Sequence, residues 1–389
     1  MEVPAIPSDA ASQLPASTTL ATTTPSPVTR VPNDQIDQVF ARTTNLASSA
    51  LNATVLACSN DYFAGAANLL TPTAPIHKPG VFVHTGAWYD GWETRRHNPE
   101  PYDWVVIKLG VAGGAIEGVE VDTAYFVGNY GEKAELQGAY VPGGQGGVSD
   151  EDIASPDYKG WSTILPVVEC GPSQRRAWKI DSYDPANPKP YTHVRLLMYP
   201  DGGFARLRLY GHAIPPPPPS SAAAQGQEKE EELSSALLGG LALSASDQHY
   251  TPASNTILPG RGKDMGDGWE TARSRTLGHV DWAIFRLGVS GTVSKVVVDT
   301  KDFRGNFPRE VRVHGLVKSD STEEPGHDHP GWVELLSGDK KTQADTEHVF
   351  EGADLAAGGE DKRVFTHAKL TLVPDGGVKR FRIFGQRTV

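Results

Sequence analysis

Apolar and polar residues alternate along many short stretches of this chain. Residues 105–109 read Val-Val-Ile-Lys-Leu and residues 205–209 read Ala-Arg-Leu-Arg-Leu, so an apolar side chain recurs at every second position. This period of two is typical of strands with one face in a core. No stretch keeps a helical period long enough to cross between parallel strands. The pattern therefore predicts an all-β fold, with antiparallel β-sandwiches of jelly-roll type.

One set of sequence blocks occurs twice, in the same order. The paired blocks are Asp-Gly-Trp-Glu-Thr at 90–94 and 267–271, Asp-Trp at 103–104 and 281–282, Val-Asp-Thr at 121–123 and 298–300, Phe-x-Gly-Asn at 126–129 and 303–306, and Pro-Asp-Gly-Gly at 200–203 and 374–377. The spacing between copies is 177 residues for the first block and 174 for the last. An internal repeat of this length predicts two tandem domains whose loops differ in length while the strands are kept.

The repeat divides the chain into four parts. We expect a first repeat at 46–212 and a second repeat at 233–389. Residues 1–45 are rich in Ser, Thr, Pro and Ala, which predicts a disordered N-terminal tail. Residues 213–232 contain five consecutive prolines followed by Glu and Lys, which predicts a stiff and then solvated linker.

Composition narrows the class of protein and its partners. Among 389 residues, 41 Gly and 30 Pro favour many turns, and a formal charge of −11 disfavours nucleic-acid binding. The two cysteines, Cys58 and Cys170, are few for a secreted protein rich in loops, and the N-terminal residues do not have a signal-peptide pattern. No apolar stretch approaches the roughly 20 residues of a membrane span. We therefore expect a cytoplasmic protein with neither a nucleic acid nor a membrane as partner.

Two repeated glutamates are the candidate catalytic residues. Glu93 and Glu270 follow a Gly-Trp pair on a loop at the edge of a predicted strand. The neighbouring Trp92 and Trp269 would raise the pKa of each carboxyl, which suits a general acid or base. In the structural alternative each glutamate caps a turn or pairs with an arginine, and on the residues alone this alternative is favoured.

Basic residues follow each glutamate, and we expect them to bind an anionic group of a substrate. They are Arg95, Arg96 and His97 in the first repeat, and Arg273 and Arg275 in the second. A guanidinium group binds a carboxylate with two parallel hydrogen bonds. In the alternative, Arg96 neutralises Glu93 or Asp103. This alternative is equally compatible with the sequence.

Other repeated polar residues have ordinary structural explanations beside functional ones. Asn129 and Asn306 could hydrogen-bond an amide or ureido group, although Asn after Gly is also a turn residue. The paired arginines on the last strand of each repeat are expected on the outward face, either solvated or ion-paired. These are Arg206 and Arg208 in the first repeat, and Arg380 and Arg382 in the second.

The evidence for a metal site is weak. His327, Asp328 and His329 carry side chains that bind divalent ions, but the cluster occurs in the second repeat only, in a polar loop. No cofactor is predicted with certainty, and a divalent metal with unknown ligands stays open.

The repeated blocks, taken together, resemble those of the allantoicase (allantoate amidinohydrolase) family, over both repeats and in the family's order. The resemblance implies two jelly-roll domains of galactose-binding-like type and a homo-oligomer. It also implies a hydrolase acting on carbon–nitrogen bonds in linear amidines. That enzyme converts allantoate to ureidoglycolate and urea in purine (allantoin) degradation. The resemblance leaves the catalytic residues unassigned.

The substrate implied by the resemblance suggests a role for each candidate. Release of urea breaks a bond from the central carbon to nitrogen, so a general acid should protonate the leaving group while a base or a metal-bound water supplies hydroxide. Either glutamate fits the acid or base. Arg96 or Arg273 fits the carboxylate, and Asn129 or Asn306 fits a ureido group.

Two other classes of function compete with the enzyme. A non-catalytic β-sandwich that binds a small ligand or carbohydrate has the same predicted fold, and so has a scaffold without a ligand. A carbohydrate-binding protein would be expected to expose aromatic side chains, whereas the aromatic residues here mostly begin or fill strands.

Overall fold

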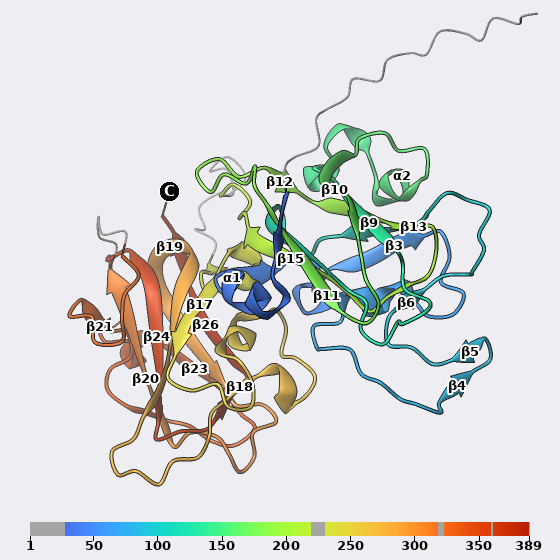
Figure 1. Ribbon diagram of the computed structural model, residues 1–389. Coiled ribbons are helices and arrows are strands. Elements are labelled where there is room, and N and C mark those ends of the chain that lie inside the picture. The colour runs from blue at the N-terminus through green and yellow to red at the C-terminus, as the bar shows by residue number, and fades with distance from the viewer. Residues whose placement is uncertain (1–27, 219–229, 318–322, 359–360, 389) are drawn as a thin grey trace, which may run out of the picture.

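The computed structural model describes residues 28–218, 230–317, 323–358 and 361–388. Figure 1 shows the first repeat, in blue to green, beside the second repeat, in yellow to red, as two β-rich lobes. Every pairing between the named strands is antiparallel. The prediction of an all-β fold made of two tandem repeats is confirmed.

The first repeat, with the segment that precedes it, is a two-layer sandwich. Its strands are β1 (Val28–Val31), β2 (Thr44–Asn45), β3 (Thr54–Cys58), β4 (Phe82–Val83), β5 (Gly86–Ala87), β6 (Trp92–Glu93), β7 (Asp103–Lys108), β8 (Gly114–Asp122), β9 (Lys133–Ala139), β10 (Ser162–Glu169), β11 (Arg175–Ile180), β12 (Pro190–Tyr191), β13 (His193–Tyr199), β14 (Gly203–Phe204) and β15 (Arg206–Ala213). One sheet has the order β1-β11-β8-β15-β2 with β12 beside β8, and the other has the order β10-β9-β13-β7-β3.

The helices of the first repeat are short. They are the α-helices α1 (Ile36–Val39) and α2 (Asp150–Ala154) and the 3₁₀ helices η1 (Asn33–Gln35), η2 (Ser49–Leu51), η3 (Ala66–Leu70) and η4 (Pro142–Gly147). Each lies in a connection between strands, so the sheets alone form the scaffold.

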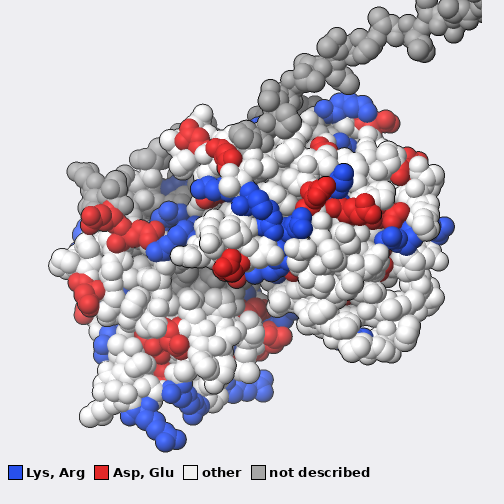
Figure 2. Space-filling view, in the orientation of Figure 1, with Lys and Arg blue, Asp and Glu red and all other residues white. Residues whose placement is uncertain are grey.

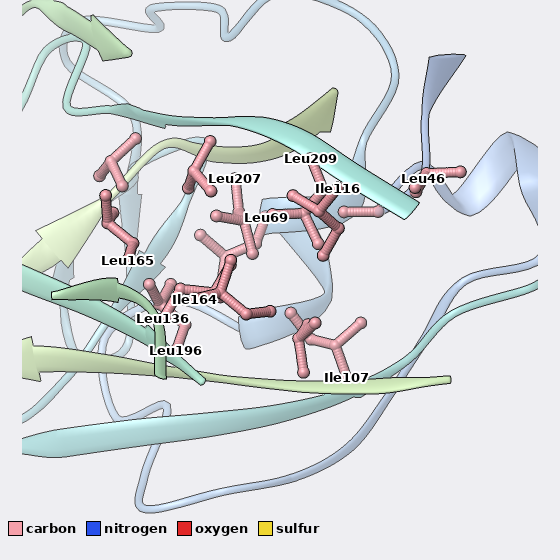
Figure 3. Close-up of a cluster of buried hydrophobic side chains, with 14 of the residues drawn as sticks. Leu46, Leu69, Ile107, Ile116, Leu136, Ile164, Leu165, Leu196, Leu207 and Leu209 are labelled. Carbon is pink, nitrogen blue, oxygen red and sulfur yellow. The ribbon is translucent and has the colours of Figure 1, made fainter. Parts of the chain in front are cut away.

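The core of the first repeat lies between its two sheets. Figure 3 shows Ile107, Leu136 and Leu196 on strands of one sheet facing Ile116 and Leu207 on strands of the other. These are the apolar positions of the period-two pattern, and all of them are buried. Polar residues between them point away from the core, which is why the alternation was visible in the sequence.

The second repeat has the same strand order in one continuous sheet. Its strands are β16 (Glu231–Glu232), β17 (Leu241–Ala245), β18 (Trp269–Glu270), β19 (Asp281–Asp299), β20 (Glu310–Val317), β21 (Trp332–Glu334), β22 (Lys340–Lys341), β23 (Glu347–Glu351), β24 (Phe365–Val373), β25 (Gly377–Val378) and β26 (Arg380–Arg387). Its 3₁₀ helices are η5 (Ala236–Leu238), η6 (Ala253–Ile257), η7 (Met265–Asp267) and η8 (Gly352–Asp354).

The long strand β19 corresponds to β7 and β8 of the first repeat joined together. It pairs with β17 and β24 along its first half and with β23 and β26 along its second half, so it takes part in both layers. A second apolar core, which includes Phe285, Val296 and Phe381, lies between these halves.

The N-terminal segment is ordered from Val28 onward, so the prediction of a disordered tail was wrong for residues 28–45. Strand β1 pairs with β11, and the ring of Phe40 stacks on Tyr210 with centroids 4.4 Å apart. Gly118 on β8 lies beneath that ring, where a Cβ atom would stand 2.2 Å from it. Apolar residues spaced through the segment, rather than its overall polar composition, decide its structure. Residues 1–27 lie outside the described residues.

Ion pairs hold the same segment to the sheet. Arg175 binds Asp37 of α1 at 2.7 Å and the fully buried Glu120 of β8 at 2.9 Å. Tyr210 donates a hydrogen bond to Glu120 at 2.7 Å. On the face shown in Figure 2, basic and acidic side chains are interspersed.

The two repeats are in direct contact. Leu51 of η2 in the first repeat belongs to the apolar core of the second. Gly239 of the second repeat permits a close approach to the first, because a Cβ there would lie 2.9 Å from the Ala213 carbonyl oxygen. Of the predicted linker, residues 219–229 lie outside the described residues. Glu231–Glu232 forms β16, which pairs with β26 on the edge of the sheet of the second repeat.

Among the described residues, no helix is long and apolar enough to cross a membrane.

The N-terminal segment yields a stability prediction. Replacing Phe40 by Ala removes a buried ring, and we expect the free energy of unfolding to fall by roughly 3 kcal/mol. Chemical denaturation followed by tryptophan fluorescence measures this change. Val39→Ala is the matched control, because Val39 lies beside Phe40 and is 40% exposed. Equal stabilities of the two variants would contradict the packing role of residues 28–45.

Candidate active site

Glu93 lies at the end of the first sandwich where four connections meet. It belongs to the two-residue strand β6, which pairs with β14 so that Glu93 stands opposite Gly203. On its other side, the Glu93 carbonyl accepts hydrogen bonds from the amides of Phe63 and Ala64. The side chain of Glu93 is only 6% exposed, and its Oε1 accepts a hydrogen bond of 2.6 Å from Nδ2 of Asn129. The structure thus brings these two candidates together.

The surroundings of Glu93 favour its protonated form. Burial raises the pKa of the Glu93 carboxyl above its usual value, and this effect outweighs the hydrogen bond from Asn129 and the charge of Arg96, which both lower it. A carboxyl with a raised pKa holds its proton at higher pH and can then donate it as a general acid.

Arg96 is oriented by an aspartate that the sequence analysis did not select. Its Nε lies 3.1 Å from Oδ1 of Asp201, and the backbone amide of His97 donates to Oδ2 of Asp201 at 2.8 Å. The expected partners Glu93 and Asp103 are therefore not those of the Arg96 ion pair. Asp201 lies against Nε, and within the described ranges neither terminal nitrogen of the guanidinium group has a hydrogen-bond partner, so both can receive a carboxylate.

Arg95 and His97 lie on the same loop and are exposed. The guanidinium group of Arg95 stacks over the ring of Tyr62 at 4.4 Å. His97 has a left-handed backbone conformation with φ of 58°, which turns the chain sharply after Arg96. Arg95 and Arg96 supply positive charge beside the buried carboxyl of Glu93.

The second repeat keeps the glutamate–asparagine pair but arranges the basic residues differently. Nδ2 of Asn306 donates to Oε1 of Glu270 at 2.5 Å. Arg273 donates from Nη2 to the carbonyl of Gly305 at 2.5 Å, so one of its terminal nitrogens is already engaged. Within the described part of the chain, Arg275 has no hydrogen-bond or ion-pair partner and is exposed.

Of the two states expected for the arginines of the last strand, solvated or ion-paired, Arg206 and Arg380 are ion-paired and not solvated. Both are almost fully buried. Nη2 of Arg206 binds Asp90 at 2.8 Å, and Nη1 of Arg380 donates to the carbonyl of Asp267 at 2.7 Å. In each repeat the loop before the Gly-Trp-Glu block folds over this strand and covers the arginine. These arginines hold that loop in place.

The described residues contain no cluster of three or more His, Cys, Asp or Glu side chains arranged to hold a metal ion. His327 stacks on Trp282 with ring centroids 4.6 Å apart, away from both glutamates. His327 thus packs against a tryptophan of β19, and His329 is exposed.

Comparison with known proteins identifies the family. The model of the allantoicase repeat matches residues 44–214 and 231–388, which are the two lobes seen here. This chain belongs to the allantoicase family.

Relatives and solved structures extend over nearly the whole chain. The sequence is 52% identical to an allantoicase of Neurospora crassa over 93% of this chain and 97% of that protein. It is 45% identical to an allantoicase of Saccharomyces cerevisiae, over 87% and 92% of the two chains. A crystal structure of the S. cerevisiae allantoicase superposes with a TM-score of 0.74 at 39% identity, covering 92% of this chain and 99% of that one.

The sequence analysis missed residues that shape this allantoicase-family site. Asp201 was noted only as part of a repeated block, Asp103 was considered only as a partner of Arg96, and Asn60 was not considered. One signal was available, because the aspartate of the Pro-Asp-Gly-Gly block is present in both repeats, as Asp201 and Asp375. In both repeats it accepts a backbone hydrogen bond from the arginine loop, at 2.8 Å.

Burial of Glu93 predicts a pH-dependent effect on stability. Because its pKa is raised in the folded protein, the ionised carboxylate destabilises the fold as the pH rises through that pKa. Glu93→Gln should therefore raise the melting temperature at pH 7.5, by about 2–4 °C for each kcal/mol relieved. The gain should shrink at pH 4.5. A difference in melting temperature that is independent of pH would contradict this account.

Proposed function

We propose that this chain hydrolyses allantoate to ureidoglycolate and urea in purine degradation, with the site of the first repeat performing the reaction. Membership of the allantoicase family supports the substrate and the reaction. The observation that carries the assignment of the site is the buried Glu93, which has a raised pKa and lies beside Asn129 and Arg96.

The reaction needs a proton at the leaving nitrogen. Allantoate carries a carboxylate and two ureido groups on one tetrahedral carbon, and loss of urea breaks the bond from that carbon to one ureido nitrogen. Glu93 gives its proton to this nitrogen as the bond breaks. The remaining ureido nitrogen donates electron density to the carbon. A water molecule then adds its oxygen to the carbon and returns a proton to Glu93, so the enzyme ends as it began.

Binding of the substrate falls to the polar groups around Glu93. Arg96, held by Asp201 through Nε, receives the carboxylate on its two terminal nitrogens. Asn129 orients the Glu93 carboxyl and offers its side-chain oxygen to a ureido N–H. Arg95 and His97 complete the basic rim of the site.

The second repeat is assigned a mainly structural role. Glu270 and Asn306 retain their hydrogen bond, but Arg273 is engaged by the Gly305 carbonyl and Ala272 replaces the arginine at position 95. The site of the second repeat therefore has no arginine at the position of Arg95, and its Arg273 is oriented by a backbone carbonyl where Arg96 is oriented by an aspartate. We further propose that the protein is a cytoplasmic homo-oligomer whose repeats extend over 46–212 and 233–389.

Turnover can be tested directly. The purified protein should release urea and ureidoglycolate from allantoate, whereas allantoin and free sugars should not react. Coupled detection of urea measures the rate, over a range of pH and with divalent metals added. Folded protein that releases no urea under any of these conditions would refute the proposed activity.

The two glutamates give a sharper test of the site. Glu93→Gln removes the proton donor and should lower kcat by about 10²- to 10⁴-fold. Glu270→Gln, the same change at the equivalent position, should leave turnover within a few-fold of the unmodified protein. Steady-state kinetics on both variants decides between the repeats. Half the activity in each variant would mean two equivalent sites, and full activity in both would remove the carboxylates from the mechanism.

A further inference from the structure

The loop that carries Glu93, Arg95 and Arg96 is fixed at several points along residues 92–98. Nε1 of Trp92 donates to the carbonyl of Asn60 at 2.9 Å, and the amide of Arg95 donates to Oδ1 of Asn60 at 2.8 Å. Further along, the amide of His97 binds Asp201. The candidate catalytic residues thus lie between fixed points on both sides.

Asn60 is itself held by a buried carboxylate. Its Nδ2 donates to Oδ1 of Asp103 at 3.0 Å, and the same oxygen accepts from Oγ of Ser59 at 2.6 Å and from Nδ2 of Asn98 at 2.9 Å. Asp103 is fully buried at the start of β7. Three donors from the connections after β3 and β6 therefore converge on one carboxylate oxygen. The contacts of Asn60 require both halves of an amide, a donor toward Asp103 and an acceptor toward Arg95.

The second repeat has the same backbone contacts with only part of this network, since Oγ of Ser246 donates to Oδ1 of Asp281 at 2.7 Å as Ser59 does to Asp103. Nε1 of Trp269 donates to the carbonyl of Asp247 at 2.9 Å, and the amide of Ala272 donates to Oδ2 of Asp247 at 2.6 Å. Asp247, however, is a carboxylate and has no N–H to donate to Asp281, the counterpart of Asp103. Arg275 stands where the first repeat has Asn98 and makes no hydrogen bond to Asp281 among the described residues.

The second repeat lacks two of the three donors, those of Asn60 and Asn98, and the change at Asn60 replaces one heavy atom, the amide nitrogen, by an oxygen. In both repeats an oxygen of residue 60 or 247 receives the loop amide, but only in the first repeat does the other end of the side chain bind the buried aspartate. Through Asn60 and Asn98, the loop of the first repeat is therefore tied to Asp103 at the start of strand β7. The loop of the second repeat is held by other connections, through Asp247, Gly305 and Asp375, and neither Asp247 nor Arg275 links it to Asp281 among the described residues. Small displacements of catalytic groups have large effects on rate, so such a tie matters for turnover.

We propose that Asn60 and Asp103 are positioning residues that hold the loop of residues 92–98 in its reactive geometry, and that Asn60 is one of the residues that distinguish the reactive repeat from its copy. This proposal rests on the proposed function of the first-repeat site. It assigns no contact with substrate to either residue.

The proposal predicts a specific pH behaviour for Asn60→Asp, which converts the first repeat to the residue of the second. The new carboxylate keeps the acceptor for the Arg95 amide but faces the carboxylate of Asp103. Two carboxylates at hydrogen-bonding distance share a proton, because the pKa of one is raised. At low pH the shared proton restores a donor toward Asp103, and at high pH the two negative charges repel.

The experiment compares Asn60→Asp with the reciprocal variant Asp247→Asn, in the full chain. At pH 8, Asn60→Asp should lower kcat/KM for allantoate by about 10²-fold. The deficit should become smaller toward pH 5, relative to the unmodified protein at each pH. Asp247→Asn should stay within about twofold throughout. Asn98→Ala, which removes another donor to Asp103, should lower kcat/KM without the recovery at low pH, and it serves if Asn60→Asp does not fold.

A second readout separates this proposal from the proposed activity. The rise in melting temperature on adding allantoate measures binding even without turnover, and at pH 8 it should be lost in Asn60→Asp and kept in Asp247→Asn. If the unmodified protein binds allantoate but releases no urea, the proposed activity fails while the positioning role is still measured by binding. Equal effects of the two reciprocal variants, or a loss in Asn60→Asp that does not change with pH, would overturn the inference.

Discussion

The hydrogen bonds to the backbone of Glu93 are the interaction on which the candidate site depends. On one side Glu93 pairs with Gly203 of β14, and on the other its amide and carbonyl bond to the backbone of Phe63 and Ala64. Trp92, next to it, is fully buried in the core. The glutamate is therefore fixed between two connections, although β6 itself has only two residues. A carboxyl held in this way can be buried without relaxing toward water, and this rigidity is what maintains its raised pKa.

The same backbone frame in the second repeat shows what the fold alone provides. Glu270 pairs with Gly377 and bridges to Thr251, as Glu93 does with Gly203 and Ala64. What differs is the set of side chains placed on this frame. Asp247 occupies the position of Asn60. Arg96 is oriented by Asp201, whereas Arg273 is oriented by the backbone carbonyl of Gly305. Chemistry on a duplicated fold is therefore decided by a few side chains whose backbone positions do not move.

Much of the fold could be predicted from the sequence, because it depends on local periodicity and on repetition. The alternation at 105–109 and 205–209 reports directly which side chains face the core, and the duplicated blocks define the two lobes. The site was only partly predictable. Glu93 and its repeat partner were found because the block containing them is duplicated, whereas the turn explanation was preferred for Asn129. Asp201 and Asn60 could not be assigned, since their role depends on connections that only the tertiary structure brings together. The buried state of Arg206 follows likewise from a loop that folds over the strand, which no periodicity reports.

The position of the site at one end of the sandwich also explains how the repeats could diverge without loss of the fold. The strands share a core, so a change in their length or register would expose apolar residues. The connections at the end of the sheets bear no such constraint. The connection from η3 to β6 is longer in the first repeat than its counterpart between η6 and β18, and it includes the hairpin of β4 and β5, in which Phe82 is 73% exposed. The first repeat could thus acquire an added hairpin and an amide at position 60 around one glutamate, while the second kept the same strands with a simpler end. A division of the two copies into one reactive and one structural unit therefore requires changes in the loops alone.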